Sequence, residues 1–358
     1  MSHSCIFLVL VLYCFYISHF AVAFTNSIRL PDNTTISWTL GEEILQNYIN
    51  PHPYQFPDSA FAVLNEYAED NTINNTLMFW TDGTTYRSEG NLSSSVSFLP
   101  NTTTPTPLYE VLSNGPLNTY DANGNWLLYI HRLPNQSLVG FTHCENHKFN
   151  CSGPYAEWNS AAIVRSDNDG YNFTRVGPAI YDPQPCEPNF GGASISSIIP
   201  RSLINPNYTG FLGYGGCTAY QSEDIGGNTN TWYRYNNGNF SSPGINGTST
   251  CLPGIPGNSC CPIVHYNTFL RKFVMLITLW GQNATAHISF SDDAINWSPM
   301  AIFCNVTDER ALAYPQILGT NSTVAGQSST LVYAGAPPQS PYPRDFITRS
   351  VTFTMTHN

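Results

Sequence analysis

The pattern His143-Cys-Glu145-Asn-His147 places one carboxyl group between two imidazoles at alternate positions. In an extended strand alternate side chains share one face, so we expect these three groups to lie side by side. Nearby imidazoles can hold a carboxyl group and tune its pKa, which suits proton transfer. We therefore assign Glu145 as the preferred general acid. Metal binding is an alternative, but the three positions span about 13 Å, too far for one ion to take all three easily.

Two further acidic residues lie close to short apolar runs. Asp82 closes the run that begins at Thr76, and Glu187 precedes the segment Phe190–Ser194. We assign Asp82 as the base or nucleophile and Glu187 as an auxiliary or alternative acid. Both also have a purely structural interpretation, because Asp before Gly is common in turns and a Glu before Pro can cap a loop.

Aromatic and amide side chains near the same runs are candidates for ligand contact. With His143 and His147, the proposed ligand-binding residues are Trp80, Tyr214, Trp280, Asn267 and Arg271. Aromatic faces stack on the C–H surfaces of sugars, and polar side chains orient ligands in pockets. The alternative for each aromatic residue is packing between sheets.

The charge balance narrows the class of partner. The net charge is −11, with 13 Lys and Arg against 24 Asp and Glu, and 13% of the residues are aromatic. Nucleic acids and anionic membrane surfaces are therefore poor partners, because they are bound through Lys and Arg. Carbohydrates suit this composition better. We expect neither a metal nor another cofactor.

The elements that must position these residues are short strands. Helical periodicity is confined to Ala60–Ala68 and Gly41–Tyr48, and elsewhere apolar or alternating runs are separated by Gly, Pro, Asn and Asp. One apolar run recurs five times, at starts roughly 50 to 70 residues apart. The five runs, which we take as inner strands, are Thr76–Trp80, Ser137–Thr142, Ala193–Ile199, Cys261–His265 and Ala311–Leu318.

A second element follows four of these runs. It has a strand end, a turn of Asp, Asn or Gly, and then a large apolar residue before Ser or Thr; the copies are 86–94, 165–174, 233–242 and 289–298. This is the chemistry of a tight hairpin. Hairpins that stack around an axis bury one another, so we predict one five-bladed β-propeller with four-stranded antiparallel blades. A two-sheet sandwich is the alternative.

A propeller also needs a device that closes its ring. The alternating segment Arg344–Met355 and a segment near Thr35–Leu40 are candidates to complete one blade from opposite ends of the chain. The same prediction implies that the ring depends on the last dozen residues.

Export is indicated by the first residues. The apolar run 5–22 is followed by Ala23, and Ala21-Val22-Ala23 has the small residues of a cleavage site. We therefore expect residues 1–23 to be a cleaved signal peptide and residues 24–358 a single domain in the secreted protein. An uncleaved anchor is the alternative, because no Lys or Arg precedes the run. No later run is long enough to span a membrane.

Glycosylation signals and cysteines agree with export. Fourteen Asn-x-Ser/Thr sequons are spread along the chain. Eight cysteines follow the signal segment, without the paired spacing of zinc sites, and we expect structural disulfides of unknown connectivity.

Several segments resemble a known group of enzymes. The hairpins 291–297 (SDDAINW) and 166–173 (SDNDGYNF), with 137–147, 190–194, 265–276 and 313–319, resemble turns and strands of arabinanase- and fructosidase-type glycoside hydrolases, which are five-bladed. The hairpins also resemble the Asp boxes of six-bladed sialidases. However, Ala294 stands where an Asp box has Gly and Asn168 where it has Asp, and no arginine triad is evident.

The resemblance implies hydrolysis of glycosidic bonds by two carboxyl groups. Those groups would lie at the axial ends of strands from different blades, and Asp82, Glu145 and Glu187 are the candidates. The alternative is a non-catalytic extracellular propeller that binds carbohydrate or protein. A structural coat or wall component is a third, weaker interpretation.

Overall fold

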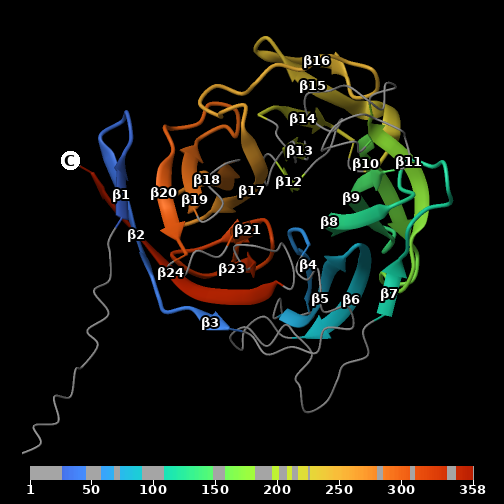
Figure 1. Ribbon diagram of the computed structural model, residues 1–358, viewed down its shortest axis with the longest axis horizontal. Helices are drawn as coiled ribbons and strands as arrows, with labels where there is room; N and C mark the ends of the chain where they lie inside the picture. Colours follow the sequence, from blue (N-terminus) through green and yellow to red (C-terminus); the bar gives the residue numbers. More distant parts are fainter. Residues whose placement is uncertain are drawn as a thin grey trace, which may run out of the picture.

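The structure is a computed structural model that describes residues 26–45, 58–67, 73–90, 109–147, 158–181, 196–200, 208–211, 217–224, 226–279, 285–306, 311–336 and 344–357. The described strands form five sheets arranged around a ring, and their strands are antiparallel except for one short parallel pair in blade 4 (Figure 1). No α-helix occurs among these residues, and a single 3-10 turn, η1 (Thr229–Thr231), precedes β15. The five-bladed propeller is thus confirmed.

The first three blades follow one another along the chain, each from the centre to the rim. Blade 1 contains β4 (Ala62–Tyr67), β5 (Ile73–Asp82), β6 (Thr84–Gly90) and β7 (Tyr109–Leu112). Blade 2 contains β8 (Gly124–Arg132), β9 (Leu138–Asn146), β10 (Trp158–Ser166) and β11 (Thr174–Ile180). Blade 3 contains β12 (Ser197–Pro200), β13 (Tyr208–Phe211), β14 (Ala219–Ser222), β15 (Trp232–Asn236) and β16 (Asn239–Pro243).

The last two blades, like blade 3, contain more than four strands. Blade 4 contains β17 (Ser259–Asn267), β18 (Lys272–Leu279), β19 (Thr285–Ser291) and β20 (Ala301–Asn305), with β22 (Val324–Ala325) parallel to β17. Blade 5 contains β21 (Ala311–Leu318), β23 (Ser328–Ala336), β24 (Asp345–His357), β2 (Thr34–Leu40) and β1 (Asn26–Arg29), with β3 (Ile44–Leu45) against β24. Four strands per blade therefore holds for blades 1 and 2 only.

Two details of the sequence-based interpretation were wrong. The segment Ala60–Ala68, predicted as helical, contains β4, and the other proposed helix, Gly41–Tyr48, includes β3. In blades 1 and 2 the recurring runs belong to the second strands, β5 and β9, rather than to the inner strands. The reason is burial: β9 is enclosed on both faces along its whole length, so it is as apolar as an inner strand.

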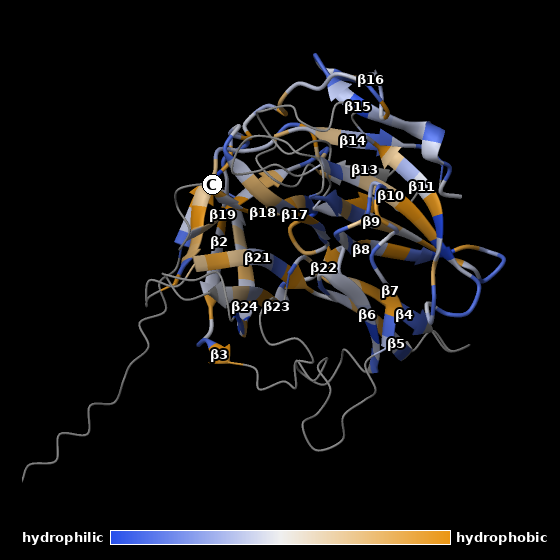
Figure 2. Cartoon of the chain, turned by 45° about the vertical axis from the view of Figure 1, so that its right-hand side comes forward, coloured by the Kyte–Doolittle hydropathy of each residue, from blue (hydrophilic) through white to orange (hydrophobic). Residues whose placement is uncertain are grey.

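The core is divided into five seams, one between each pair of neighbouring blades. Phe79 and Leu127 belong to the seam of blades 1 and 2, Tyr220 and Phe141 to that of blades 2 and 3, and Phe353 and Phe290 to that of blades 4 and 5. Apolar residues follow the strands and hydrophilic ones the turns (Figure 2). Because a blade cannot bury both of its faces alone, the ring is the unit that stabilises it.

Three of the four hairpin segments, 165–174, 233–242 and 289–298, lie where they were expected, between outer strands of their blades, and the turn of the first, 86–94, lies outside the described residues. Three of their turns use a positive φ, at Asp169, Asn237 and Ala294. Ala294, with φ 62°, occupies the left-handed region that favours glycine. These turns position the rim of the propeller.

The ring is closed by strands from opposite ends of the chain. β2 pairs with β24 over seven residues, from Thr34 opposite His357 to Leu40 opposite Val351. The predicted closing segments are therefore neighbours in blade 5. The proposed signal peptide, residues 1–23, lies outside the described residues. Among the residues that are described, no helix has the length and hydrophobicity to cross a membrane.

Candidate active site

Glu145 lies near the end of β9 and receives hydrogen bonds from both predicted imidazoles. His143 Nε2 is 2.9 Å from Glu145 Oε1, and His147 Nε2 is 2.6 Å from Oε2. Burial alone would raise the pKa of Glu145, but the hydrogen bonds and charges of the two imidazoles outweigh it and lower this pKa to about 2. Glu145 is thus an ionised carboxylate at neutral pH. Its side chain is 7% exposed and that of His147 is 44% exposed, so His147 is the member that solvent reaches.

A second buried carboxyl group, Asp58, belongs to the same region. Arg344 Nη1 donates to Asp58 Oδ1 at 2.5 Å, and Trp126 Nε1 donates to Oδ2 at 3.0 Å. Burial raises the pKa of Asp58, Arg344 lowers it, and the negative charge of Glu145 raises it again, so that it lies above the usual range. The two carboxyl groups are close enough to influence one another, and their pKa values are shifted in opposite directions.

Three blades bring these groups together. Asp58 lies four residues before β4 of blade 1, Trp126 is on β8 of blade 2, and Arg344 immediately precedes β24 of blade 5. The guanidinium of Arg344 also lies 5.4 Å from the centre of the Tyr314 ring on β21. The Trp126 ring in turn contacts His143, at 5.1 Å between centroids. We call the cluster Asp58, Trp126, His143, Glu145, His147 and Arg344 the axial mouth, because it lies at the end where β4 and β8 begin.

Asp82 and Trp80 lie beside the axial mouth on β5. The Asp58 backbone N–H donates to the Thr81 carbonyl at 3.2 Å, which places Asp82 next to Asp58 along the sheet. Trp80 is only 2% exposed and stacks on Tyr86 at 4.8 Å between centroids. It packs in the seam between blades 1 and 5 rather than offering a face to a ligand.

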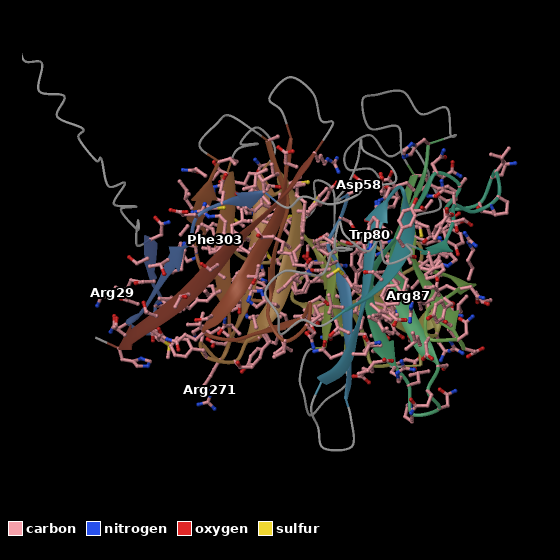
Figure 3. The ribbon with its side chains drawn as sticks, turned by 90° about the horizontal axis from the view of Figure 1, so that it is seen from below. Arg29, Asp58, Trp80, Arg87, Arg271 and Phe303 are labelled. Carbon is pink, nitrogen blue, oxygen red and sulfur yellow. A yellow bond between two sulfur atoms is a disulfide. The ribbon has the colours of Figure 1, made fainter. Side chains whose placement is uncertain are left out.

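Asn267 and Arg271 lie at the opposite end of the propeller. Figure 3 shows Arg271 projecting from the face away from Asp58. Asn267 is fully buried, and its Oδ1 accepts hydrogen bonds from the backbone N–H groups of Phe269 and Leu270, so it holds the turn between β17 and β18. The structure does not bring these two residues to Glu145.

Three proposed site residues, Glu187, Tyr214 and Trp280, lie outside the described residues. Of the others, Glu145, His143 and His147 form one cluster, and Asp82 lies near it.

Sequence reasoning missed Asp58 and Arg344. The two residues are 286 positions apart, and only ring closure makes them neighbours. The sequence carries a signal for Asp58, because a charged residue a few positions before a buried strand is a candidate for a site. It was overlooked because the alanine-rich segment after it was interpreted as a helix.

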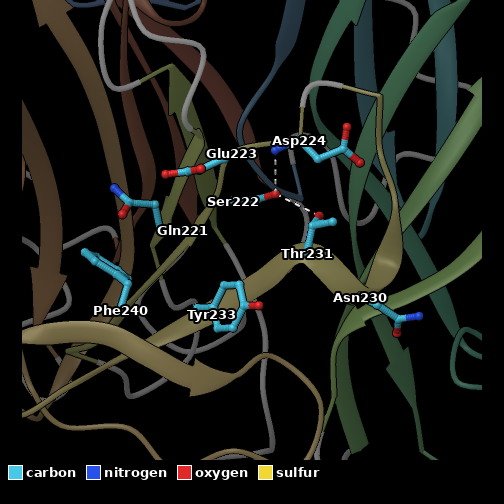
Figure 4. A pocket seen from close by; sticks show the side chains of 8 residues that line it. All are labelled: Gln221, Ser222, Glu223, Asp224, Asn230, Thr231, Tyr233 and Phe240. Atoms are coloured by element: carbon cyan, nitrogen blue, oxygen red, sulfur yellow. Dashed lines mark hydrogen bonds between the residues drawn. The ribbon is translucent and has the colours of Figure 1, made fainter.

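A separate cavity of about 570 Å³ lies on blade 3, lined by residues of β14, β15, β16 and the β14–β15 connection (Figure 4). Its carboxylate Asp224 accepts backbone N–H bonds from Gly226 at 2.7 Å and Asn228 at 2.8 Å. Partial burial opposes ionisation of Asp224, but these bonds lower its pKa. The carboxylate therefore holds its own loop, in contrast to Glu145. Among the described residues, no group of three or more His, Cys, Asp or Glu is arranged to hold a metal ion.

Comparisons with known proteins identify the fold of the chain. No protein-family model matches the sequence, and no curated protein matches it. Among solved structures, the chain is similar to the catalytic domain of a family 62 α-L-arabinofuranosidase from Coprinopsis cinerea, with a TM-score of 0.50, 10% identity and coverage of 88% of this chain and 96% of that one. An α-L-arabinofuranosidase from Podospora anserina, solved in complex with cellotriose, gives a TM-score of 0.50 at 12% identity, with the same two coverages, 88% and 96%. At such low identity the similarity concerns the fold, and the chain shares the five-bladed propeller fold of glycoside hydrolases.

Proposed function

We propose that the chain is a secreted glycoprotein that hydrolyses glycosidic bonds at the axial mouth. The observation that carries this proposal is the pair Asp58 and Glu145, two carboxyl groups from different blades with pKa values shifted in opposite directions. Such a pair is what acid and base assignments in one site require. The fold shared with α-L-arabinofuranosidases supports a glycan as the substrate class.

The electrostatics suggest a different division of roles from the one expected for Glu145. A group with a pKa of about 2 is a poor proton donor at neutral pH, so we assign Glu145 as the carboxylate that acts on water or on the sugar. Asp58, whose pKa is raised, is the proposed donor to the leaving oxygen. Asp82, which the sequence suggested as the base or nucleophile, becomes an auxiliary carboxyl group in this proposal, and Glu187 stays an auxiliary or alternative acid.

The positively charged or hydrogen-bonding groups of the mouth fit hydroxyl-rich ligands. His147 is the exposed member, and Arg344 lies beside the proposed donor. We therefore expect neutral glycans, including arabinose-containing polysaccharides, to be better substrates than anionic ones, because the net charge of −11 repels the latter.

The test is a screen of the secreted protein against aryl glycosides and plant, fungal and bacterial polysaccharides. In the variants Glu145→Gln and Asp58→Asn we expect kcat to fall by about 100-fold or more, as for loss of a general acid or base. The matched control is Asp293→Asn in the rim hairpin, which should keep kcat within about twofold. Activity that survives both mouth substitutions would remove these residues from the mechanism.

A second function is favoured by one observation. Both oxygens of Glu145 are occupied by imidazoles, and both oxygens of Asp58 by Arg344 and Trp126. Carboxyl groups so fully bonded suit a rigid site that binds carbohydrate or protein without turnover. Glycan binding by calorimetry, with no product released from the same glycans, would favour this alternative.

Export is supported by surface chemistry. Among the asparagines whose burial the structure describes, seven that belong to sequons are exposed: Asn33, Asn135, Asn172, Asn239, Asn246, Asn296 and Asn305. A disulfide joins Cys217 on the β13–β14 connection to Cys251, which suits an oxidising compartment. Expression of the full chain in a eukaryotic secretory host, with amino-terminal sequencing of the product, tests both export and cleavage after Ala23.

A further inference from the structure

Two adjacent cysteines, Cys260 and Cys261, begin the inner strand of blade 4. Their sulfur atoms lie 2.8 Å apart, closer than two sulfur atoms pack without a bond. Neighbouring residues of a regular strand point to opposite faces, which would hold the two thiols apart. The backbone at these two residues must therefore depart from a regular strand, so that both sulfur atoms lie on the same face.

A β-bulge supplies this change of direction. Cys260 pairs with Thr278 and Ile263 with Leu276, so that Cys261 and Pro262 together oppose the single residue Ile277. Cys261 has φ 53°, a left-handed conformation that is uncommon for a residue other than glycine. The extra residue and the positive φ place the two side chains next to each other.

Hydrogen bonds from two sides hold this bulge. Ser196 and Ser197 of blade 3 both donate their hydroxyl groups to the Pro262 carbonyl, at 2.7 and 3.0 Å. Thr278 donates to the Cys260 carbonyl at 3.3 Å. These hydrogen bonds hold the unusual backbone conformation of Cys261 in place. Such conformations cluster at functional sites.

The pair also lies beside the axial mouth. Ile263, two residues after Cys261, belongs to the same packed core cluster as Trp126 of the mouth and Ala60, two residues after Asp58. The charges of Arg344 and Asp58 accordingly act on the Cys261 thiol. Cys261 is 5% exposed, whereas Cys260 is half-buried and can be reached by a reagent. Cys260 is therefore the thiol that would react first.

We infer that Cys260 and Cys261 form a disulfide between adjacent residues in the exported protein, and that this ring is part of the wall of the axial mouth. The oxidant is a low-molecular-mass disulfide such as oxidised glutathione. The Cys260 thiolate attacks one of its sulfurs and releases one thiol; the Cys261 thiolate then attacks Cys260 Sγ and releases the second. Two cysteine thiols become one disulfide as the oxidant becomes two thiols, so electrons and protons balance.

The covalent bond is tested independently of any activity. The purified full chain is denatured without reductant, alkylated, digested and analysed by mass spectrometry. We expect the peptide with Cys260 and Cys261 to lack alkyl groups on both residues and to be two hydrogen atoms lighter than its reduced form. Alkylation of both thiols, or a bond from either one to Cys151 or Cys186, would overturn the inference.

The position of the ring in the mouth is tested by function, and this part rests on the proposed glycan activity. Unbonded sulfurs must move apart on reduction, and the movement reaches Arg344 and Asp58. We expect mild reductant, or the double substitution Cys260→Ser and Cys261→Ser, to weaken glycan binding or raise KM by about threefold to tenfold, or about 1 kcal/mol.

The control carries Cys217→Ser and Cys251→Ser, which removes the other disulfide. Its binding should keep the same sensitivity to reductant. If the ring is present but reduction leaves binding unchanged in both proteins, the disulfide is structural and does not line the site. If no glycan binds in any state, the proposed function fails while the mass measurement still decides the bond.

Discussion

The axial mouth and the rim turns both hold carboxylates with lowered pKa values, but by different means. At the rim, Asp293 is only partly buried, which opposes ionisation, and backbone N–H groups of Asn296 and Ile295 lower its pKa. In the mouth, Glu145 is buried and depends on the side chains of His143 and His147. Rim carboxylates therefore stabilise their own loops. The carboxylates of the mouth are held by side chains instead. The partners of Glu145 come from its own strand and the residue directly after it. Asp58, in contrast, depends on Arg344 and Trp126, which only the folded ring brings to it, and groups held in this way are the better candidates for function.

The largest effect on the contrast between mouth and rim is expected when the ring is opened. Removing residues 345–358 deletes β24, which pairs with β2 and follows Arg344. We expect loss of the whole free energy of unfolding, about 5 to 15 kcal/mol, and no cooperative melting by calorimetry or circular dichroism. Deleting the edge strand β1, whose side chains are half exposed, is the control and should leave a cooperative transition. Cooperative melting without β24 would show that closure is dispensable.

Removing the cation of the mouth should have the next largest effect. Arg344→Met leaves Asp58 buried without its ion partner, and we expect a loss of about 3 to 5 kcal/mol in urea unfolding. Adding Asp58→Asn should restore part of this loss. The comparison outside the mouth is Arg132→Met, whose partners Glu66 and Asp169 are more exposed and whose loss should cost less than about 1 kcal/mol. Equal losses of unfolding free energy in Arg344→Met and Arg132→Met would show that the ion pair of the mouth is no more important for stability than the exposed one.

The pH dependence of stability sharpens the comparison further. The pKa of Glu145 is about 2 when folded, against about 4.3 in an unfolded chain, so its contribution is complete above pH 4.3 and is lost as the pH falls toward 2. Between pH 5 and pH 3 we expect the parent to lose about 2 kcal/mol more than Glu145→Gln, measured by denaturant unfolding. Parallel pH profiles for the two proteins would show that the imidazoles do not depress this pKa.

The smallest effect is expected at the rim. Asp293→Ala removes the acceptor of several hydrogen bonds within one turn and should cost about 1 kcal/mol of stability. Because the turn is remote from the mouth, the pH profile and any glycan activity should stay as in the parent. A change in kcat with this variant would connect the rim to the site.

Much of the fold could be predicted from the sequence, because hairpin chemistry is local. The turns at 165–174 and 289–298 and the closing segments each carry their own signal. The inner strands β4 and β8 were missed because burial on both faces makes β5 and β9 equally apolar. Whether a strand is the first or the second of its blade depends on how far it lies from the axis of the ring, and a local sequence pattern does not indicate this distance.

Only part of the candidate site could be predicted from the sequence. Glu145 and its imidazoles follow from strand spacing, since they occupy alternate positions of one strand. Asp58 and Arg344 meet across nearly the whole chain, and Trp126 joins them from a third segment. Contacts between such distant segments are set by topology, so the sequence predicted the carboxylate but not its counterpart.

The pairing of β2 with β24 has a consequence for biosynthesis. Residues 34–40 cannot pair with β24 until residues 351–357 have left the ribosome, so one of the first strands to be synthesised lacks this partner until the last strand is complete. Contacts of such long sequence separation form slowly. In the exported protein that we propose, acceptor asparagines would be open to oligosaccharide transfer during that interval, and an incompletely synthesised chain exposes unpaired strand edges that are prone to aggregation.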